Sequence, residues 1–188
     1  MLRVILKLFL SVSALGLPLV SAGCGGSILD TEANAALLEK VGETTVTVFP
    51  AFCRHSKENV YDTSAAKSIA AFLVEDKLAA PTISDVHVPI KGPWHGNQAR
   101  MLRESAAAFA DYLKANPIET DYALLPEYLF GRSNAGGIHC YVLDADGAVA
   151  YVVLQNSHHE PFATAKPKTA KDCTEVLIEV LRKQRFAD

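Results

Sequence analysis

The feature that most constrains the fold is a predicted β-hairpin, "GIHCYVLDADGAVAYVVLQN", in which two apolar runs flank Asp146-Gly147. An Asp-Gly pair between such runs is a strong signal for a two-residue hairpin turn. A turn of that length pairs Cys140 with Val153. The second run, Val149–Leu154, is apolar at successive positions, so we expect a central strand that is covered on both faces. The chain must therefore supply further strands and helices around this hairpin.

Periodicity predicts the remaining elements. Alternating or continuous apolar runs indicate strands, and apolar positions at i, i+3, i+4 and i+7 indicate amphipathic helices. The expected strands are 43–53, 82–90 and 120–130, and the expected helices are 63–78, 98–116 and one that begins at Thr169. The last helix has its apolar stripe at Cys173, Val176, Leu177, Val180 and Leu181. The order β-α-β-α-β-β-β-α predicts one α/β (α+β) domain over residues 43–188, with a mixed central sheet of about five strands and three main helices.

The N-terminal residues 1–23 have the features of an export signal. Arg3 and Lys7 precede an apolar run, Leu8–Val20, that is too short for a stable membrane span. Residues 24–42 are expected to form a tether with a short helix. About 165 residues remain after the signal, enough for one domain with its own core.

The stretch Ser21-Ala22-Gly23-Cys24 resembles the lipobox of bacterial lipoproteins. The resemblance implies that Cys24 becomes the N-terminus, carries covalent lipid and anchors the chain to a membrane. Ser21 stands where that family prefers leucine, so cleavage after Ala22, giving a soluble exported protein, stays as an alternative. An uncleaved N-terminal anchor is a third alternative. Each route places the domain in the periplasm or cell envelope.

Charge and cysteine content limit the remaining possibilities. The formal net charge is −3 and the basic residues do not cluster, which argues against a nucleic-acid partner. In an oxidising compartment the thiols must be counted with care. Without Cys24, three cysteines remain, so either Cys140 and Cys173 form a disulfide and Cys53 is free, or all three are buried thiols.

Most of the chain beyond the signal resembles the small α/β domain of envelope lipoproteins of the curli-secretion type and the N-terminal domain of the Tol-Pal propeller protein. The matching residues are Phe49-Pro50 at the end of a strand, Asp121-Tyr122 after the second helix, and Asp144-Ala145-Asp146-Gly147 in the hairpin. The segments "KGPWHGN" and "NSHHEPF" have no counterpart in that pattern. The resemblance implies envelope assembly or binding by contact with a protein partner, not catalysis.

A second resemblance is to thioredoxin-like proteins, in which a strand ends in Cys-x-x-Cys. Here the corresponding residues are Cys53-Arg54-His55-Ser56, so the second cysteine is missing. No proline precedes the hairpin strand at Gly137-Ile138, where that fold carries its cis-proline. Cys53 alone would need a lowered pKa to act as a nucleophile.

The segment "NSHHEPF" contains His158, His159 and Glu160, which suggest a metal or acid–base site. Adjacent side chains of an extended chain point to opposite sides, so a loop that ends the strand is the simpler interpretation. His139, inside the hairpin strand, is a further candidate metal ligand. Trp94 and His95, in a Gly/Pro-rich loop, are candidates for partner binding.

Taken together, these patterns favour an exported envelope lipoprotein with a non-catalytic binding or assembly role and no cofactor beyond the lipid on Cys24. The alternative is a periplasmic enzyme or redox protein. It would use the Cys53 thiol, or a site formed by His158, His159 and Glu160 that acts by acid–base chemistry or holds a transition metal. We expect the two classes to differ in whether these residues and His139 converge on one cleft.

Overall fold

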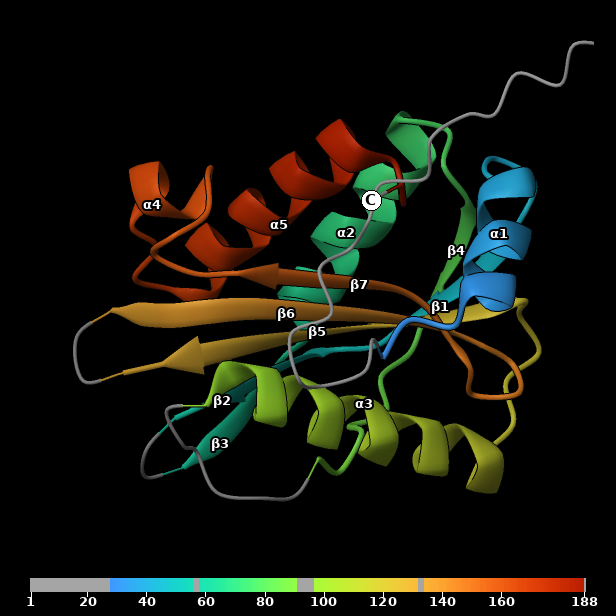
Figure 1. Cartoon of the computed structure of the whole chain (residues 1–188), viewed down its shortest axis with the longest axis horizontal. Coiled ribbons are helices and arrows are strands. Elements are labelled where there is room, and N and C mark those ends of the chain that lie inside the picture. Colours follow the sequence, from blue (N-terminus) through green and yellow to red (C-terminus); the bar gives the residue numbers. More distant parts are fainter. Residues whose placement is uncertain (1–27, 56–57, 91–96, 132–133, 188) are drawn as a thin grey trace, which may run out of the picture.

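The computed structural model describes residues 28–55, 58–90, 97–131 and 134–187. Within these ranges the chain forms a single mixed α/β domain with an open seven-stranded sheet and five helices, which confirms the expected fold class. Helices α2 and α5 cover one face of the sheet and α3 covers the other (Figure 1). None of the described helices has the length and apolar character needed to cross a membrane.

The elements follow the chain in a βαβ-rich order. The helices are α1 (Thr31–Glu39), α2 (Thr63–Glu75), α3 (Gln98–Ala115), α4 (Phe162–Ala165) and α5 (Ala170–Gln184). The strands are β1 (Thr45–Val48), β2 (Ala51–Arg54), β3 (Asn59–Asp62), β4 (Ala80–Ile83), β5 (Tyr122–Phe130), β6 (Ala135–Asp144) and β7 (Val149–Gln155).

Strand β5 lies at the centre of the sheet. On one side it pairs antiparallel with β6, which in turn pairs with β7. On the other side β1 and β2 follow one another along β5, both parallel to it, and are flanked by β4 and β3. The expected strand 43–53 is thus broken at Phe49-Pro50, where proline has no N–H to donate. Because two pairs of strands lie in series, the seven strands occupy five positions across the sheet.

The hairpin has the expected register but not the expected turn. Cys140 pairs with Val153, as the sequence predicts. The turn is longer than two residues: the Asp144 carboxylate accepts hydrogen bonds from the backbone of Asp146 and Ala148, and a register shift follows at Val142/Leu143. This irregularity restores the pairing that a two-residue turn would have produced.

Two predicted strand positions need correction. In the described part of the sheet β7 pairs only with β6, so it is an outer strand and not a central one. Helix α1 packs against β7, and this contact explains why the strand is apolar. The expected strand 82–90 is represented only by β4, which ends at Ile83, and the polar segment after Arg54 contributes β3.

Helix α1 belongs to the domain, which corrects the expected tether over residues 24–42. The backbone N–H of Asp30 donates to Val149 O at 2.9 Å, and Asn34 Nδ2 donates to Ala150 O at 2.8 Å. The Leu37 side chain is 1% exposed. The Asp30 side chain caps the helix by accepting from two backbone N–H groups of the first turn. Ile28 also packs against the core under α3, so the region that can act as a tether ends before Ile28.

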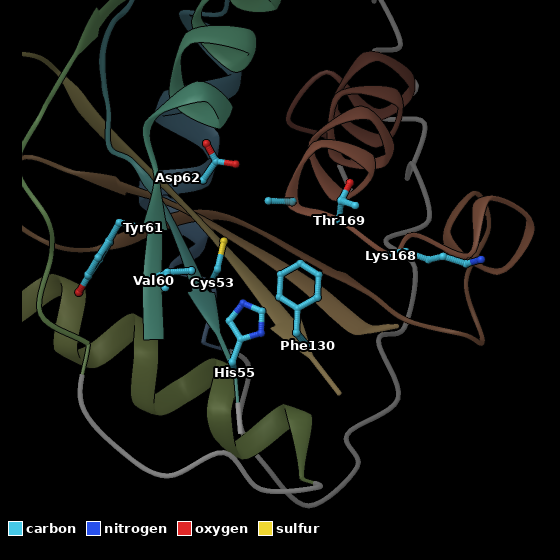
Figure 2. Close-up of a pocket in the computed structure, with 9 residues that line it drawn as sticks. Cys53, His55, Val60, Tyr61, Asp62, Phe130, Lys168 and Thr169 are labelled. Carbon is cyan, nitrogen blue, oxygen red and sulfur yellow. The ribbon is translucent and has the colours of Figure 1, made fainter. Parts of the chain in front are cut away.

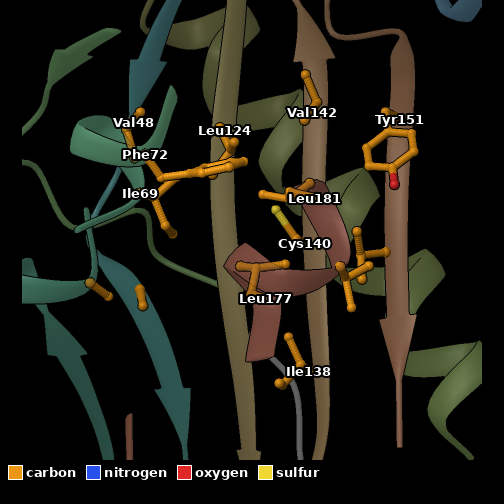
Figure 3. Close-up of a cluster of buried hydrophobic side chains, with 14 of the residues drawn as sticks. Val48, Ile69, Phe72, Leu124, Ile138, Cys140, Val142, Tyr151, Leu177 and Leu181 are labelled. Atoms are coloured by element: carbon orange, nitrogen blue, oxygen red, sulfur yellow. The ribbon is translucent and has the colours of Figure 1, made fainter. Parts of the chain in front are cut away.

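The larger apolar core lies between the sheet and helices α2 and α5. Figure 3 shows Leu177 and Leu181 of α5 lying over Cys140 and Ile138 of β6. All five residues of the predicted α5 stripe are buried, as the periodicity indicates. Full burial of each large aliphatic side chain contributes about 1.5–3 kcal/mol. A second core, on the opposite face, is covered by α3 and contains Phe109.

Candidate functional site

A pocket opens at the carboxyl ends of β2 and β5, beside the start of α5 (Figure 2). Its volume is about 290 Å³, and its lining comes from β2, β3, β5 and the first residues of α5. The His55 ring stacks on Phe130, with centroids 4.6 Å apart and planes 7° from parallel. Figure 2 shows the Cys53 sulfur directed between Asp62 and Thr169. Ligands of open α/β sheets commonly bind at this end of the strands.

Cys53 forms part of the wall of this pocket but is not poised as a nucleophile. Its residue is 1% exposed, and its Sγ lies 3.9 Å from the carbonyl oxygen of Ala51. Burial, together with the negative charge of Asp62, raises the pKa of the thiol to about 12. Because the thiolate is the reactive form, the geometry disfavours the predicted nucleophilic role.

Cys140 and Cys173 are free thiols in this structure, so the possible disulfide between them is not formed here. Both are fully buried in the core between the sheet and α5, and burial raises the pKa of each thiol well above its ordinary value. The alternative of three buried thiols matches the structure. They lie around Tyr128, whose hydroxyl makes a 2.8 Å hydrogen bond with Thr174 Oγ1.

The residues His158, His159 and Glu160 lie in an exposed turn after β7. Asn156 closes this turn: its Oδ1 accepts from the backbone N–H of His158 at 2.9 Å, and its carbonyl accepts from that of His159 at 3.0 Å. In the parts of the chain that the structure describes, no three His, Cys, Asp or Glu side chains are grouped to hold a metal ion. The segment has the geometry of a loop that ends a strand.

His139 is fully buried on the α3 side of the sheet, whereas His158 and His159 are exposed to solvent. Its Nδ1 lies 3.1 Å from Glu127 Oε2 and 3.2 Å from the Tyr141 hydroxyl. The predicted metal ligands are therefore not brought together. Instead, His139 belongs to a buried polar cluster on strands β2, β5 and β6 and helix α3, which we call the Glu127 cluster: Arg54, Ser105, Glu127, His139 and Tyr141.

Glu127 is the centre of this cluster. Its Oε1 accepts from Arg54 Nε at 2.9 Å, Arg54 Nη2 at 2.8 Å and Ser105 Oγ at 3.2 Å. Its Oε2 accepts from the Tyr141 hydroxyl at 2.6 Å. Burial favours a higher pKa for this carboxyl, but the hydrogen bond and electrostatic attraction of His139, then Arg54 and Tyr141, outweigh it and hold the pKa below its ordinary value.

Four of these five residues, all except His139, were not predicted from the sequence as site residues. A usable signal exists in "YALLPEYLF", where Glu127 is the one charged residue of an otherwise apolar strand. A charge in a covered strand requires a partner. The sequence does not show that the partner is Arg54, which lies 73 positions earlier.

The predicted site residues do not converge. Cys53 faces α5, whereas His139 lies on the opposite face of the sheet and His158–Glu160 are exposed at the end of β7. Trp94 and His95 lie outside the described residues. Asn97, the first described residue after them, caps α3 by accepting from the backbone N–H of Arg100 at 2.9 Å.

No protein family model matches the chain, and no curated protein matches it in sequence. Among solved structures, it is similar to a point variant of PelC from Paraburkholderia phytofirmans, solved as a dodecamer. The two chains are 15% identical over 76% of this chain and 88% of that one, with a TM-score of 0.40. A likeness at this level carries no conclusion about function or assembly.

Proposed function

We propose that the chain is an exported envelope lipoprotein, anchored through lipid on Cys24, whose domain binds a protein partner or assists assembly without catalysing a reaction. The export signal and the lipobox-like Ser21-Ala22-Gly23-Cys24 support the location. The anchor would leave only the residues between Cys24 and Ile28 as a tether, because Ile28 and α1 are packed on the domain.

The observation that carries the non-catalytic role is the separation of the reactive side chains. Catalysis by a thiol or a histidine requires a nucleophile or base and its partner within hydrogen-bond reach. Cys53 faces one core, His139 lies on the other side of the sheet, and His159 is in an exposed turn. This arrangement favours binding over chemistry at any of them.

We place the binding surface at the pocket between β2, β3 and α5. The side chains of His55 and Lys168 line it and make no hydrogen bond or ion pair within the described ranges. Val60, on the outer strand β3, is 43% exposed at its edge. Uncommitted polar groups next to exposed apolar surface are what a partner can use.

Lipidation is tested by labelling the full chain with radioactive palmitate in a bacterial host that processes lipoproteins. Label is expected in the wild type and in Cys173→Ala, and absent from Cys24→Ala, which should also leave the membrane fraction. Equal labelling of all three chains would contradict the anchor.

The binding surface is tested by photo-crosslinking in intact cells. A photoreactive residue at Val60 is expected to give a discrete adduct with one envelope protein. The matched control is Val74, another exposed valine, which lies at the other end of α2 and is 60% exposed. The same adducts from both positions, or none from Val60, would remove the pocket from the proposal.

A further inference from the structure

The two faces of the sheet differ in buried charge. Among the described residues, the buried side chains that carry or can carry charge, cysteines and tyrosines aside, are Arg54, Glu127 and His139. All three belong to the Glu127 cluster, under α3. The core under α2 and α5 contains thiols, hydroxyls and apolar groups instead.

The Glu127 carboxylate is the one negatively charged group of the cluster, and the other four side chains all contact it. The Glu127 carboxylate accepts from Arg54 of β2, from Ser105 of α3 and from Tyr141 of β6, and His139 Nδ1 is also within hydrogen-bond distance. Ser105 additionally lies 3.2 Å from Arg54 Nη2, so α3 is tied to both partners of the ion pair. The polar attachment of α3 to the sheet at this level depends on that carboxylate.

Not every polar atom of the cluster has a hydrogen-bond partner among the described residues. His139 Nε2 is buried and has no hydrogen-bond partner in the described part of the chain. A proton on Glu127 would neutralise the carboxylate that accepts from Arg54 Nε and Nη2, and would convert an acceptor into a donor. Removing one partner of a buried ion pair is far more disruptive than removing both, because the other charge stays buried and unpaired.

We propose that Glu127 is an acid-sensitive latch: uptake of a proton by the cluster loosens α3 from the sheet, while α2 and α5 remain packed on the other face. The groups that face Glu127 are Arg54, His139, Tyr141 and Ser105. On the far side of β6, the neighbour of His139 is the uncharged Leu154. Loosening α3 exposes the apolar surface that it covers, including Phe49, Phe52 and Leu125.

The acidity range follows from the direction of the Glu127 pKa, which lies below its ordinary value of 4.5 in the folded protein. A depressed carboxyl pKa stabilises the closed state above the ordinary value, and this contribution is lost as the pH falls through the folded value. The latch therefore opens below about pH 4.5. Opening that is linked to one proton changes by up to about tenfold for each pH unit.

The test is hydrogen exchange by mass spectrometry on the full chain in detergent, at about pH 7 and about pH 3, corrected for intrinsic rates. Peptides from α3 are expected to lose protection relative to the later turns of α5, by up to about tenfold for each pH unit below 4.5. The first turn of α5 is not a reference, because Asp172 caps it and its pKa is itself lowered by backbone hydrogen bonds. Binding of an apolar dye should rise in parallel.

Variants separate the latch from general acid damage. Glu127→Gln is expected to expose α3 already at neutral pH. The double variant Arg54→Met, Glu127→Gln removes both charges and should restore protection while abolishing the acid response. Glu104→Gln, an exposed carboxylate of α3 that pairs with Arg100, is the matched control and should respond like wild type.

Equal loss of protection in α3 and in the later turns of α5 would overturn the proposal, as would no loss in either. An unchanged acid response in the double variant would overturn it too. If Glu127→Gln fails to fold, the comparison of α3 with the later turns of α5 in the wild-type chain at the two pH values still tests the proposal.

Discussion

At the scale of single residues, the face of the sheet on which a side chain lies determines its partners and its charge state. Cys53 and Arg54 are neighbours on β2, and successive side chains of a strand point to opposite faces. Cys53 therefore enters the core under α5, where burial keeps it a neutral thiol. Arg54 enters the Glu127 cluster, where it is 3% exposed and ion-paired.

The raised pKa of Cys53 predicts slow alkylation of the native protein. At pH 8 a thiol with a pKa of about 12 has on the order of a thousandfold less thiolate than a free cysteine. Iodoacetamide kinetics followed by peptide mapping should show this at Cys53. His55→Ala should leave the rate unchanged, and a large decrease in that variant would show that His55 activates the thiol.

A second prediction at this scale concerns Tyr128. Thr174 Oγ1 donates to the carbonyl of Ala170 at 2.9 Å, so it accepts from the Tyr128 hydroxyl. Tyr128→Phe leaves that acceptor unpaired in the core and should lower the free energy of unfolding by about 1 kcal/mol. Urea unfolding measures this. Tyr122→Phe removes a hydroxyl that has no hydrogen-bond partner among the described residues and is not buried; it is the control and should change stability less.

At the scale of elements, α1 shows how a short helix is stabilised by packing. Nine residues are too few for a stable helix in isolation. Here the Asp30 cap and the contact with β7 provide the additional stabilisation that the helix needs. The same contact covers the outer strand of the hairpin, which would otherwise present an open edge.

Two adjacent leucines of α1 test this packing. Leu37→Ala should destabilise the domain by about 2–5 kcal/mol, because the side chain is 1% exposed in the core. Leu38→Ala, whose side chain is 39% exposed, should cost much less. Thermal unfolding of both variants is the measurement. Similar small effects from both would show that α1 is not held against the domain.

At the scale of the whole molecule, the sheet is protected differently at its two sides. Strand β7 is covered by α1, whereas β3 and β4 have exposed apolar side chains, Val60 and Ile83. Pro81 lies within β4 and has no N–H, which weakens that side as a template for another strand.

Removing α1 should therefore change how the molecule associates. A chain that begins at Gly42 exposes β7 and is expected to self-associate more strongly with concentration than a chain that begins at Ser27. Light scattering over a concentration series measures this. If the two chains behave alike, α1 does not protect the edge.

The sequence alone determined the class of fold, most of the element order and the buried stripe of α5. These depend on local periodicity, which acts between residues close in the chain. The pairing of Cys140 with Val153 was predicted from a two-residue turn, but a longer turn and a register shift produce it. The broken first strand was only partly visible, because Pro50 marks a possible end without showing that the chain continues as β2.

The Glu127 cluster could be recognised only in the tertiary structure. Arg54, Ser105, Glu127 and His139 come from four elements, and the order of strands across the sheet brings them together. That same order put Cys53 and His139 on opposite faces, although both are in strands next to β5. Periodicity assigns a residue to one side of its own strand, but which neighbour and which helix it meets depends on pairing between segments far apart in the chain.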